Sequence, residues 1–513
     1  MFPALKNIYR LLSIVQTLAR NDLLWLLKDV GVPNGVIKTA HIIVKPKTKG
    51  RPGERIANAL QELGPTFIKF GQALSTRTDL LGEKLAKDLS KLQDNLSPFD
   101  KTEVRNIIEQ ELGIKIEECF SEFTWEPVAA ASIAQVHFAV TQEGEEVAVK
   151  VLRPNIERAF TKDIALFLWI ATLLEHSRPE IRRLKPIEVV EIFEETVRLE
   201  MDFRLEAAAA QELAENFASD NDFKVPNINW QRTSRRVLTM ERISGIPIDE
   251  RDAIIQAGHD PDKILIRAAT SLFKQVFRDG FFHADQHPGN LFVGKEGEII
   301  AVDFGIMGRL DKPTRHYLGE MLESFLERDY PRVAELHFEA GYVPYNKSVQ
   351  AFTQACRSIA EPILDKPQNE ISIARLLAHL FQVTETFEME TQPQLLLLQK
   401  TMLTAEGVGR TLSPDANMWF LAQPLIKGWV DKNMGPEIIV LNVVEEVANG
   451  LKRLPVIISN LEKNVVEITN SGLKLNTDTI RDIIATQKTD KPIPSWFYIT
   501  LIIVLLILLY LGK

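Results

Sequence analysis

The chain has 513 residues, of which 45% are hydrophobic and 25% charged, a composition typical of globular rather than disordered proteins. Its length predicts two or three structural units. The formal net charge of −9 argues against a general nucleic-acid-binding protein, which would be basic. The two cysteines, Cys119 and Cys356, lack the spacing of a disulfide framework or zinc site, so we expect two ordinary buried thiols.

The first 119 residues are expected to be mostly helical. Residues 1–53 combine apolar positions at helical spacing with a basic linker that contains Pro and Gly. This segment is either an amphipathic helix on a membrane surface or a helix packed against the body of the protein. Residues 54–119 are predicted to be a helical extension, in which Gly64-Pro65 separates two helices. Lys69 and Gln72 lie three residues apart on the second helix and therefore on one face.

Residues 120–243 change to a strand pattern. The runs 128–140 and 146–151 predict a hairpin, and the second run contains Val-Ala-Val-Lys ending at Lys150. This is the pattern of the kinase strand whose lysine contacts nucleotide phosphates. The loop before it aligns with the kinase phosphate loop but has alanine at all three glycine positions, which predicts a stiffer loop. The loop residues expected to contact the nucleotide are Ala129, Ala130, Ala131, Ser132, Ile133, Ala134, Gln135 and Val136.

An acidic helical segment follows at 188–217. A kinase site needs a helix glutamate to hold the strand lysine, and we assign this role to Glu206. Glu200 and Asp202 could instead meet Lys69 and Gln72, although an acidic helix face is often only solvated.

A second strand pair is predicted from Val225 to about residue 243. It passes into a loop that contains Gly245. An apolar strand entering such a loop is typical of a hinge between two lobes, where backbone groups can bind adenine. The hinge residues expected at the nucleotide are Met240, Glu241 and Ile243.

The densest group of motifs lies at 282–305. Asp285 precedes Asn290 by five residues, and an Asp-Phe-Gly begins at Asp303, with a predicted hairpin between them. This layout can bring a base, an amide oxygen and a second carboxylate together, as phosphoryl transfer from a nucleotide–Mg²⁺ complex requires. Asn290 and Asp303 are therefore candidate Mg²⁺ ligands, and Asp285 is the candidate base. His283 and His287 are expected to fix the loop through hydrogen bonds.

The rest of the chain is predicted to be helical up to an apolar end. No Ala-Pro-Glu follows Asp303, so little room remains for a peptide-substrate platform. Residues 493–511 form an uncharged segment of 19 residues, about 28 Å long as a helix at ~1.5 Å per residue. This length is close to the ~30 Å of a bilayer core and predicts one membrane-spanning helix. A buried terminal helix is the alternative.

Together these motifs resemble the UbiB family of atypical protein-kinase-like proteins, which is associated with isoprenoid quinone biosynthesis. The matching motifs are KxGQ at 69–72, the Ala-rich loop, Lys150, ExD at 200–202, HxDxHPGN at 283–290 and DFG at 303–305. The resemblance implies an α+β, bilobal protein-kinase-like fold that binds ATP and Mg²⁺. Its N-lobe would be 120–243, its C-lobe core 244–345 and its helical C-terminal region 346–490. The extension with Lys69 and Gln72 would cover the place where a protein substrate enters.

The expected function is that of a membrane-anchored atypical kinase or ATPase supporting isoprenoid quinone or other prenyl-lipid metabolism. The expected partners are the lipid bilayer, prenylated quinone precursors and quinone-biosynthesis enzymes. Most of the chain is expected on the cytoplasmic, stromal or matrix side, because the sequence leaves the host membrane open. One alternative is a protein serine/threonine kinase, against which the Ala-rich loop and the missing Ala-Pro-Glu count. Another is a nucleotide-binding pseudokinase scaffold, against which the intact Lys150, Asp285, Asn290 and Asp303 count.

Overall fold

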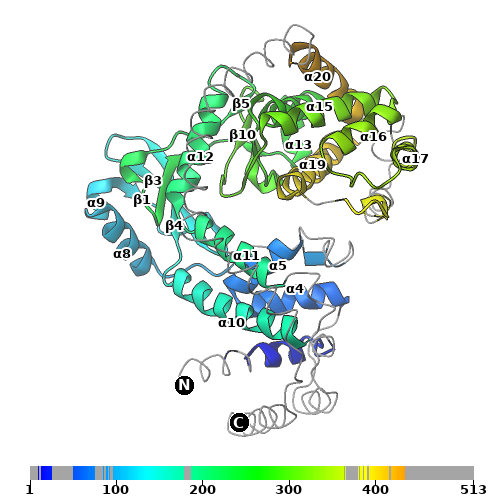
Figure 1. Cartoon of the computed structure of the whole chain (residues 1–513). Coiled ribbons are helices and arrows are strands. Elements are labelled where there is room, and N and C mark those ends of the chain that lie inside the picture. The colour runs from blue at the N-terminus through cyan, green and yellow to red at the C-terminus, as the bar shows by residue number, and fades with distance from the viewer. Residues whose placement is uncertain are drawn as a thin grey trace, which may run out of the picture. The chain divides into compact units, whose positions relative to one another are not determined.

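The computed structural model describes residues 10, 13–25, 50–75, 96–177, 186–362, 392–414 and 418–433, with isolated positions at 85–92 and 364–389 (Figure 1). Within these stretches, no helix is both long and apolar enough to cross a membrane. The segment 493–511, for which the sequence predicts a membrane span, lies outside the described residues, as does most of 1–49.

The N-terminal extension contains α4 (Pro52–Leu63) and α5 (Pro65–Ser75), and the predicted break at Gly64-Pro65 is confirmed. Gly64 has a φ of 102°, which favours glycine, and Pro65 opens the next helix. Phe67 and Phe70 of α5 contact Phe167 of α10 (Ile156–Ser177), with ring centroids 4.9 and 4.7 Å apart. These aromatic contacts join the extension to the helices of the N-lobe.

The N-lobe is built on one antiparallel sheet with the order β1-β3-β4-β6, and β2 pairs with β3. Its strands are β1 (Phe120–Phe123), β2 (Ala129–Ala130), β3 (Ala134–Thr141), β4 (Glu146–Leu152) and β6 (Val237–Glu241). The predicted hairpin is the β3–β4 pair. Val147, Val149 and Val151 of β4 are buried with residues of α8 (Lys101–Leu112). Because side chains alternate along a strand, Lys150 lies on the opposite face.

Helices cover that opposite face of the N-lobe sheet. They are α10, α11 (Pro186–Glu200) and α12 (Phe203–Asn216), while the short α9 (Ile116–Cys119) precedes β1. Phe160, Phe193 and Phe203 form one buried cluster there with Leu152 and Leu238 of the sheet. Lys150 therefore projects from the face of the sheet that packs against these helices. Cys119 and Cys356 are both buried and free, as predicted.

The C-lobe contains a small sheet with the order β5-β10-β9-β7 and a two-stranded ribbon, β11-β8. The strands are β5 (Phe223–Lys224), β7 (Ile246–Pro247), β8 (Phe281–His283), β9 (Leu291–Val293), β10 (Ile299–Ala301) and β11 (Met307–Arg309). The predicted hairpin between the motifs is β9–β10.

One expectation about strands was wrong in part. The second strand of the predicted pair forms as β6, but no strand starts at Val225: β5 ends at Lys224 and pairs in parallel with β10 of the C-lobe. A single bridge, Ile228 to Met240, remains from the expected pairing. After Gly305 the described residues are almost wholly helical, as predicted, apart from β11, which pairs with β8 before the helices begin.

The C-lobe helices are α13 (Arg251–Gln256), α14 (Pro261–Phe273), α15 (Lys312–Leu326), α16 (Tyr330–Glu339), α17 (Val349–Ala360), α19 (Pro393–Leu412) and α20 (Met418–Asn433). A π-helical turn, Lys274–Asp279, continues α14. Helix α19 packs against α14 and β11, and its Val408 and Leu412 are buried in the C-lobe core with Phe281 and Phe304. Part of the predicted helical region 346–490 therefore belongs to the C-lobe itself.

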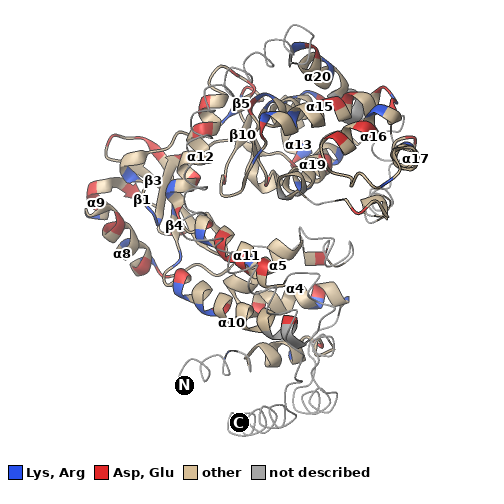
Figure 2. Ribbon diagram, in the orientation of Figure 1, with Lys and Arg blue, Asp and Glu red and all other residues tan. Residues whose placement is uncertain are grey.

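Charged residues of both signs are interspersed along α10, α15 and α16 (Figure 2). On α16, Arg332 bonds to Glu320 of α15 and to Glu335 and Glu339 of its own helix, at 2.7 to 3.3 Å. These helices thus carry local charge networks rather than stripes of one sign.

Candidate active site

Lys150 stands at the centre of the site. Its ammonium donates to both carboxylate oxygens of Glu206 on α12, at 2.8 and 3.0 Å, and to Asp303 Oδ1 at 2.8 Å. The predicted partner, Glu206, is therefore in place. An ammonium has three N–H groups, and here all three are used.

The three charges at this point perturb one another strongly. Although burial disfavours its charged form, the carboxylates of Asp303 and Glu206 raise the pKa of Lys150. The ammonium of Lys150 in turn lowers the pKa of Asp303, and the positive charge of Lys69 adds to that effect. Glu206 is only 6% exposed, and burial raises its pKa to about 7 despite the ion pair. One lysine is thus shared by two carboxylates, and the more buried carboxylate binds its proton more tightly.

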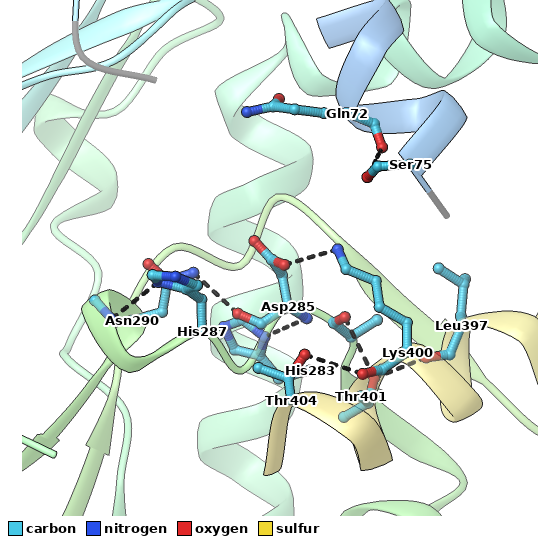
Figure 3. A network of polar contacts seen from close by, with 12 residues as sticks. Gln72, Ser75, His283, Asp285, His287, Asn290, Leu397, Lys400, Thr401 and Thr404 are labelled. Atoms are coloured by element: carbon cyan, nitrogen blue, oxygen red, sulfur yellow. Dashed lines mark hydrogen bonds and ion pairs between the residues drawn. The ribbon is translucent and has the colours of Figure 1, made fainter. Parts of the chain in front are cut away.

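The catalytic-loop residues follow β8 and are fixed by their own hydrogen bonds (Figure 3). His283 Nδ1 accepts from the Asp285 N–H at 3.1 Å, so the ring proton lies on Nε2, which donates to Val302 O at 3.0 Å. Burial lowers the pKa of His283, which keeps it neutral. His287 Nδ1 accepts from the Gly289 N–H at 3.2 Å. Both histidines therefore shape the loop, as the sequence predicted.

The two candidate metal ligands are oriented by the same loop geometry. Asn290 Nδ2 donates to the carbonyl of Asp285 at 2.9 Å, which leaves the amide oxygen free to face a cation. Asp303 has a φ of 62°, a left-handed conformation that non-glycine residues seldom adopt and that is found at functional sites. In the described part of the chain, no donor bonds to Asn290 Oδ1 or to Asp303 Oδ2.

A lysine that the sequence analysis missed contacts the candidate base. Lys400 Nζ of α19 donates to Asp285 Oδ1 at 2.8 Å, and the next residue, Thr401, is fully buried and contacts Ala284 O at 3.3 Å (Figure 3). No motif marks Lys400. The only sequence signal is a basic residue within a helix whose neighbours Leu395–Leu398 are apolar.

The extension reaches the site through α5. Lys69 Nζ lies 3.0 Å from Glu200 Oε2, and both side chains are largely buried, so this expected pair forms. The other expected pair, Asp202 with Gln72, does not form. Asp202 begins α12, where it accepts from the Arg204 N–H and binds the Arg204 guanidinium, because a helix N-cap needs an acceptor. Gln72 Nε2 donates to Leu92 O at 3.2 Å.

Arg153 fixes the Ala-rich loop through hydrogen bonds from its backbone and its side chain. The Arg153 backbone N–H donates to Ile133 O at 2.8 Å, and its guanidinium donates to Ala131 O at 2.9 Å and Ser97 O at 3.0 Å. The side chain of Gln135, one of the predicted loop residues, is buried and bonded to the Phe99 N–H and to His137, which leaves only its backbone for a nucleotide contact.

The other loop positions differ in how well they can meet a ligand. Ala129, Ala130, Ala131 and Val136 are exposed or half-buried, while Ile133 and Ala134 are packed in the core. The Ser132 hydroxyl is buried and has no hydrogen-bond partner among the described residues.

The predicted hinge lies at the end of β6. Met240 is buried, the Glu241 side chain binds Lys224 and Asn227, and the Glu241 N–H donates to Asn227 O. The N–H of Ile243 has no acceptor in the described stretches, so a ligand edge could accept from it. The backbone groups of the hinge are therefore better suited to bind adenine than its side chains are.

The polar side chains of this site fit a magnesium nucleotide. No group of three His, Cys, Asp or Glu side chains suited to a metal occurs among the described residues. Mg²⁺, however, is commonly bound through one or two protein oxygens plus substrate phosphates. Asn290 Oδ1 and Asp303 Oδ2 supply such oxygens, and Lys150 supplies a cation for phosphates. The orphaned Ser132 hydroxyl provides one further donor.

The two lobes, the lysine–glutamate pair and the Asp-Phe-Gly loop define a protein-kinase-like protein. Residues 91–337 match the ABC1 atypical kinase-like domain, and residues 356–417 match the UbiB helical domain. The chain belongs to the UbiB family of atypical kinase-like proteins.

Several relatives support this membership. The chain is 42% identical over 436 residues to a "Probable protein kinase UbiB" of Marinobacter nauticus, covering 84% of this chain and 79% of that one. It is 40% identical over 472 residues to the protein of the same name from Cellvibrio japonicus, covering 90% and 85%. Among solved structures it resembles a complex of Rv3197 with erythromycin from Mycobacterium tuberculosis, with a TM-score of 0.51 and 27% identity. That match covers 72% of this chain and 93% of the other.

Proposed function

We propose that the chain is an atypical kinase or ATPase that binds Mg-ATP and acts on a small molecule or water. The observation that carries the proposal is the ammonium of Lys150, bonded at once to Glu206 and Asp303. This is the strand-lysine, helix-glutamate and metal-aspartate arrangement that an active kinase site requires.

The residues would divide the work as follows. Lys150, positioned by Glu206, would bind phosphate oxygens with the donor that bonds to Asp303 in the ligand-free structure, and Asn290 and Asp303 would hold Mg²⁺. The metal would neutralise charge on the phosphates when bound. Asp285 orients the attacking hydroxyl or water and accepts its proton. The neutral His283 keeps the loop in place by bonding to the Asp285 N–H and to Val302 O.

A small acceptor is supported by the position of the extension. Helix α5 is tied to the N-lobe by the Lys69–Glu200 pair, and the charge of Lys69 reaches Asp303. In Figure 3, Gln72 and Ser75 of α5 lie on the side of the catalytic loop toward which the Asp285 carboxylate points. A folded segment in this position limits the entry of a peptide.

We propose further that the activity supports isoprenoid quinone or other prenyl-lipid metabolism at a membrane. The family motifs support this assignment. The apolar segment 493–511 would provide a single C-terminal anchor. Quinone precursors and the enzymes that act on them are the proposed partners.

The first test is nucleotide binding and turnover by the purified chain. Mg-ATP should raise the unfolding temperature of the wild type, and Asp303→Ala should abolish the Mg²⁺-dependent part of that rise. Phosphate release should be lost in Asp285→Asn. Retained Mg-dependent stabilisation in Asp303→Ala would contradict the metal assignment.

The second test concerns the acceptor. Prenyl lipids should be profiled in a deletion strain complemented by the intact gene or by its Asp303→Ala copy. Rescue by the intact gene alone supports the quinone role, whereas unchanged lipid profiles in the deletion strain would overturn it. Labelling of general peptide substrates by the purified chain would favour the protein kinase activity that the relatives' names suggest.

A further inference from the structure

We propose that Lys400 is a catalytic residue that contacts the terminal phosphate during transfer. The C-terminal helical region would thereby supply a cation that the kinase core lacks at this point. This inference rests on the proposed function, because it names a residue of the same site.

The hydrogen bonding of Lys400 is incomplete in a way that points to a ligand. Its ammonium has three N–H groups. Asp285 Oδ1 accepts one of them at 2.8 Å, and no other acceptor in the described part of the chain bonds to Lys400. Lys150 differs, because Glu206 and Asp303 occupy all of its donors. Two N–H groups of Lys400 are therefore available to an anion beside the candidate base.

Asp285 also has a free carboxylate oxygen next to Lys400. Its Oδ2 accepts no hydrogen bond from the described residues, and the side chains of Asp285 and Lys400 are 33% and 32% exposed. A free carboxylate oxygen and a free ammonium thus meet side by side at an accessible point. The carboxylate can receive the proton of the acceptor, and the ammonium can bind equatorial oxygens of the phosphoryl group that the acceptor attacks.

A purely structural role for Lys400 is already filled by its neighbour. Thr401 is fully buried and contacts Ala284 O, and Val408 and Leu412 are buried in the C-lobe core. These contacts hold α19 against the catalytic loop without any charge. A half-exposed lysine adds little to such packing, since exposed ion pairs contribute ~0–1 kcal/mol.

The chemistry of the step explains the need for the charge. An oxygen of the acceptor bonds to the γ-phosphorus while the bond from that phosphorus to the β,γ-bridging oxygen breaks. The electron pair leaves on ADP, and the acceptor's proton passes to Asp285. Negative charge is spread over the equatorial oxygens of the transferred group, where a positioned cation stabilises it.

The test compares binding of a triphosphate and a diphosphate. Lys400→Met keeps the length of the stem and removes the charge. It should weaken binding of a non-hydrolysable Mg-ATP analogue by about 10- to 100-fold, the effect of one charge-assisted hydrogen bond. Mg-ADP affinity should change less than about twofold, because ADP lacks the contacted group. Parallel loss of both affinities, or an unchanged ratio between them, would overturn the assignment.

Lys347→Met is the matched control. Lys347 lies in the same lobe, pairs with Glu388 at 2.9 Å and is 21% exposed, so it loses a comparable ion pair away from the site. The control should keep wild-type affinities for both nucleotides. A change in the ratio of those affinities in this control would mean that the readout does not report on Lys400.

Chemical rescue keeps the test valid even if the methionine variant folds poorly. Lys400→Cys can be aminoethylated to restore an ammonium, or carbamidomethylated to give a neutral side chain of similar size. Both native cysteines are buried, and burial raises the pKa of Cys119 and raises that of Cys356 to about 12, so neither competes. Only the aminoethylated protein should recover triphosphate selectivity; equal recovery with both reagents would refute a role for the charge.

The proposed function and this assignment fail in different ways. If the wild type binds neither Mg-ATP analogue nor Mg-ADP, the proposed function is wrong. If it binds both and Lys400→Met keeps the wild-type ratio, only the role of Lys400 is wrong.

Discussion

Glu206 is a group of the site through which pH should act on the ligand-free protein. Burial raises its pKa to about 7, and the nearby carboxylate of Asp303 acts in the same direction. Lys150 remains charged, because its pKa is raised by Asp303 and Glu206. Asp303 remains ionised, because Lys150 lowers its pKa. Of these three groups, only Glu206 titrates between pH 5 and 8.

The sign and size of the effect follow from proton linkage. An unfolded glutamate titrates near 4.5, so between this value and about 7 the folded chain keeps a proton that the unfolded chain releases. The stabilising contribution is therefore fully present below pH 4.5 and is lost as the pH rises through 7. The difference between the two pKa values corresponds to about 3 kcal/mol.

The assay compares unfolding temperatures of the wild type and Glu206→Gln at pH 5, 6, 7 and 8, without metal or nucleotide. Glutamine imitates the protonated carboxyl and does not titrate. The wild type should lose on the order of 5 °C relative to the variant across this range. His283 is present in both proteins, so its titration cancels in the comparison. Glu195→Gln, which removes an exposed charge on α11, should track the wild type at every pH. A wild-type-to-Glu206→Gln difference that stays constant from pH 5 to 8 would refute the reasoning.

Three further substitutions test the surroundings of the site. Arg153→Met removes the guanidinium that bonds to the Ala-rich loop, so nucleotide affinity measured by calorimetry should fall about tenfold; unchanged affinity would contradict the role of that bond. Lys69→Met leaves the carboxylate of Glu200 without its partner, so amide exchange in α5 should accelerate by about tenfold, and adding Glu200→Gln should reverse part of this. Gly308→Ala would place a methyl group in steric conflict with the Cζ end of the Phe282 ring, which is fully buried on β8 before the catalytic loop. It should destabilise the chain by about 2 kcal/mol in thermal unfolding and lower turnover.

Contacts set by local periodicity could be predicted from the sequence. Strand alternation turns Lys150 away from the valines of β4, and α12 presents Glu206 one turn after Asp202 begins the helix. The hydrogen bonds of His283 and His287 are likewise made within their own loop, so spacing alone indicates them.

Contacts that depend on how distant segments pack could not be predicted in this way. The pairing of β5 with β10 joins residues 223–224 to 299–300, and a two-residue strand has too little pattern to show its partner. Lys400 is 115 residues from Asp285, and its role depends on α19 being part of the C-lobe core. A lone lysine on a helix is usually solvated, and the apolar run Leu395–Leu398 before it indicates a buried helix without indicating a partner for the lysine.

The described site brings together cations from three parts of the chain. Lys69 comes from the N-terminal extension, Lys150 from the N-lobe and Lys400 from the C-terminal helical region. Against the carboxylates of Glu206, Asp285 and Asp303, Lys150 alone would leave a strongly negative site, which opposes the binding of an anionic nucleotide. Lys400 offsets the charge of Asp285, and Lys69, although it pairs with Glu200, also lowers the pKa of Asp303. The extension and the helical region therefore both contribute charged side chains to the candidate active site. A shortened chain containing only residues 120–345 should bind Mg-ATP more weakly than the full chain, even if it folds.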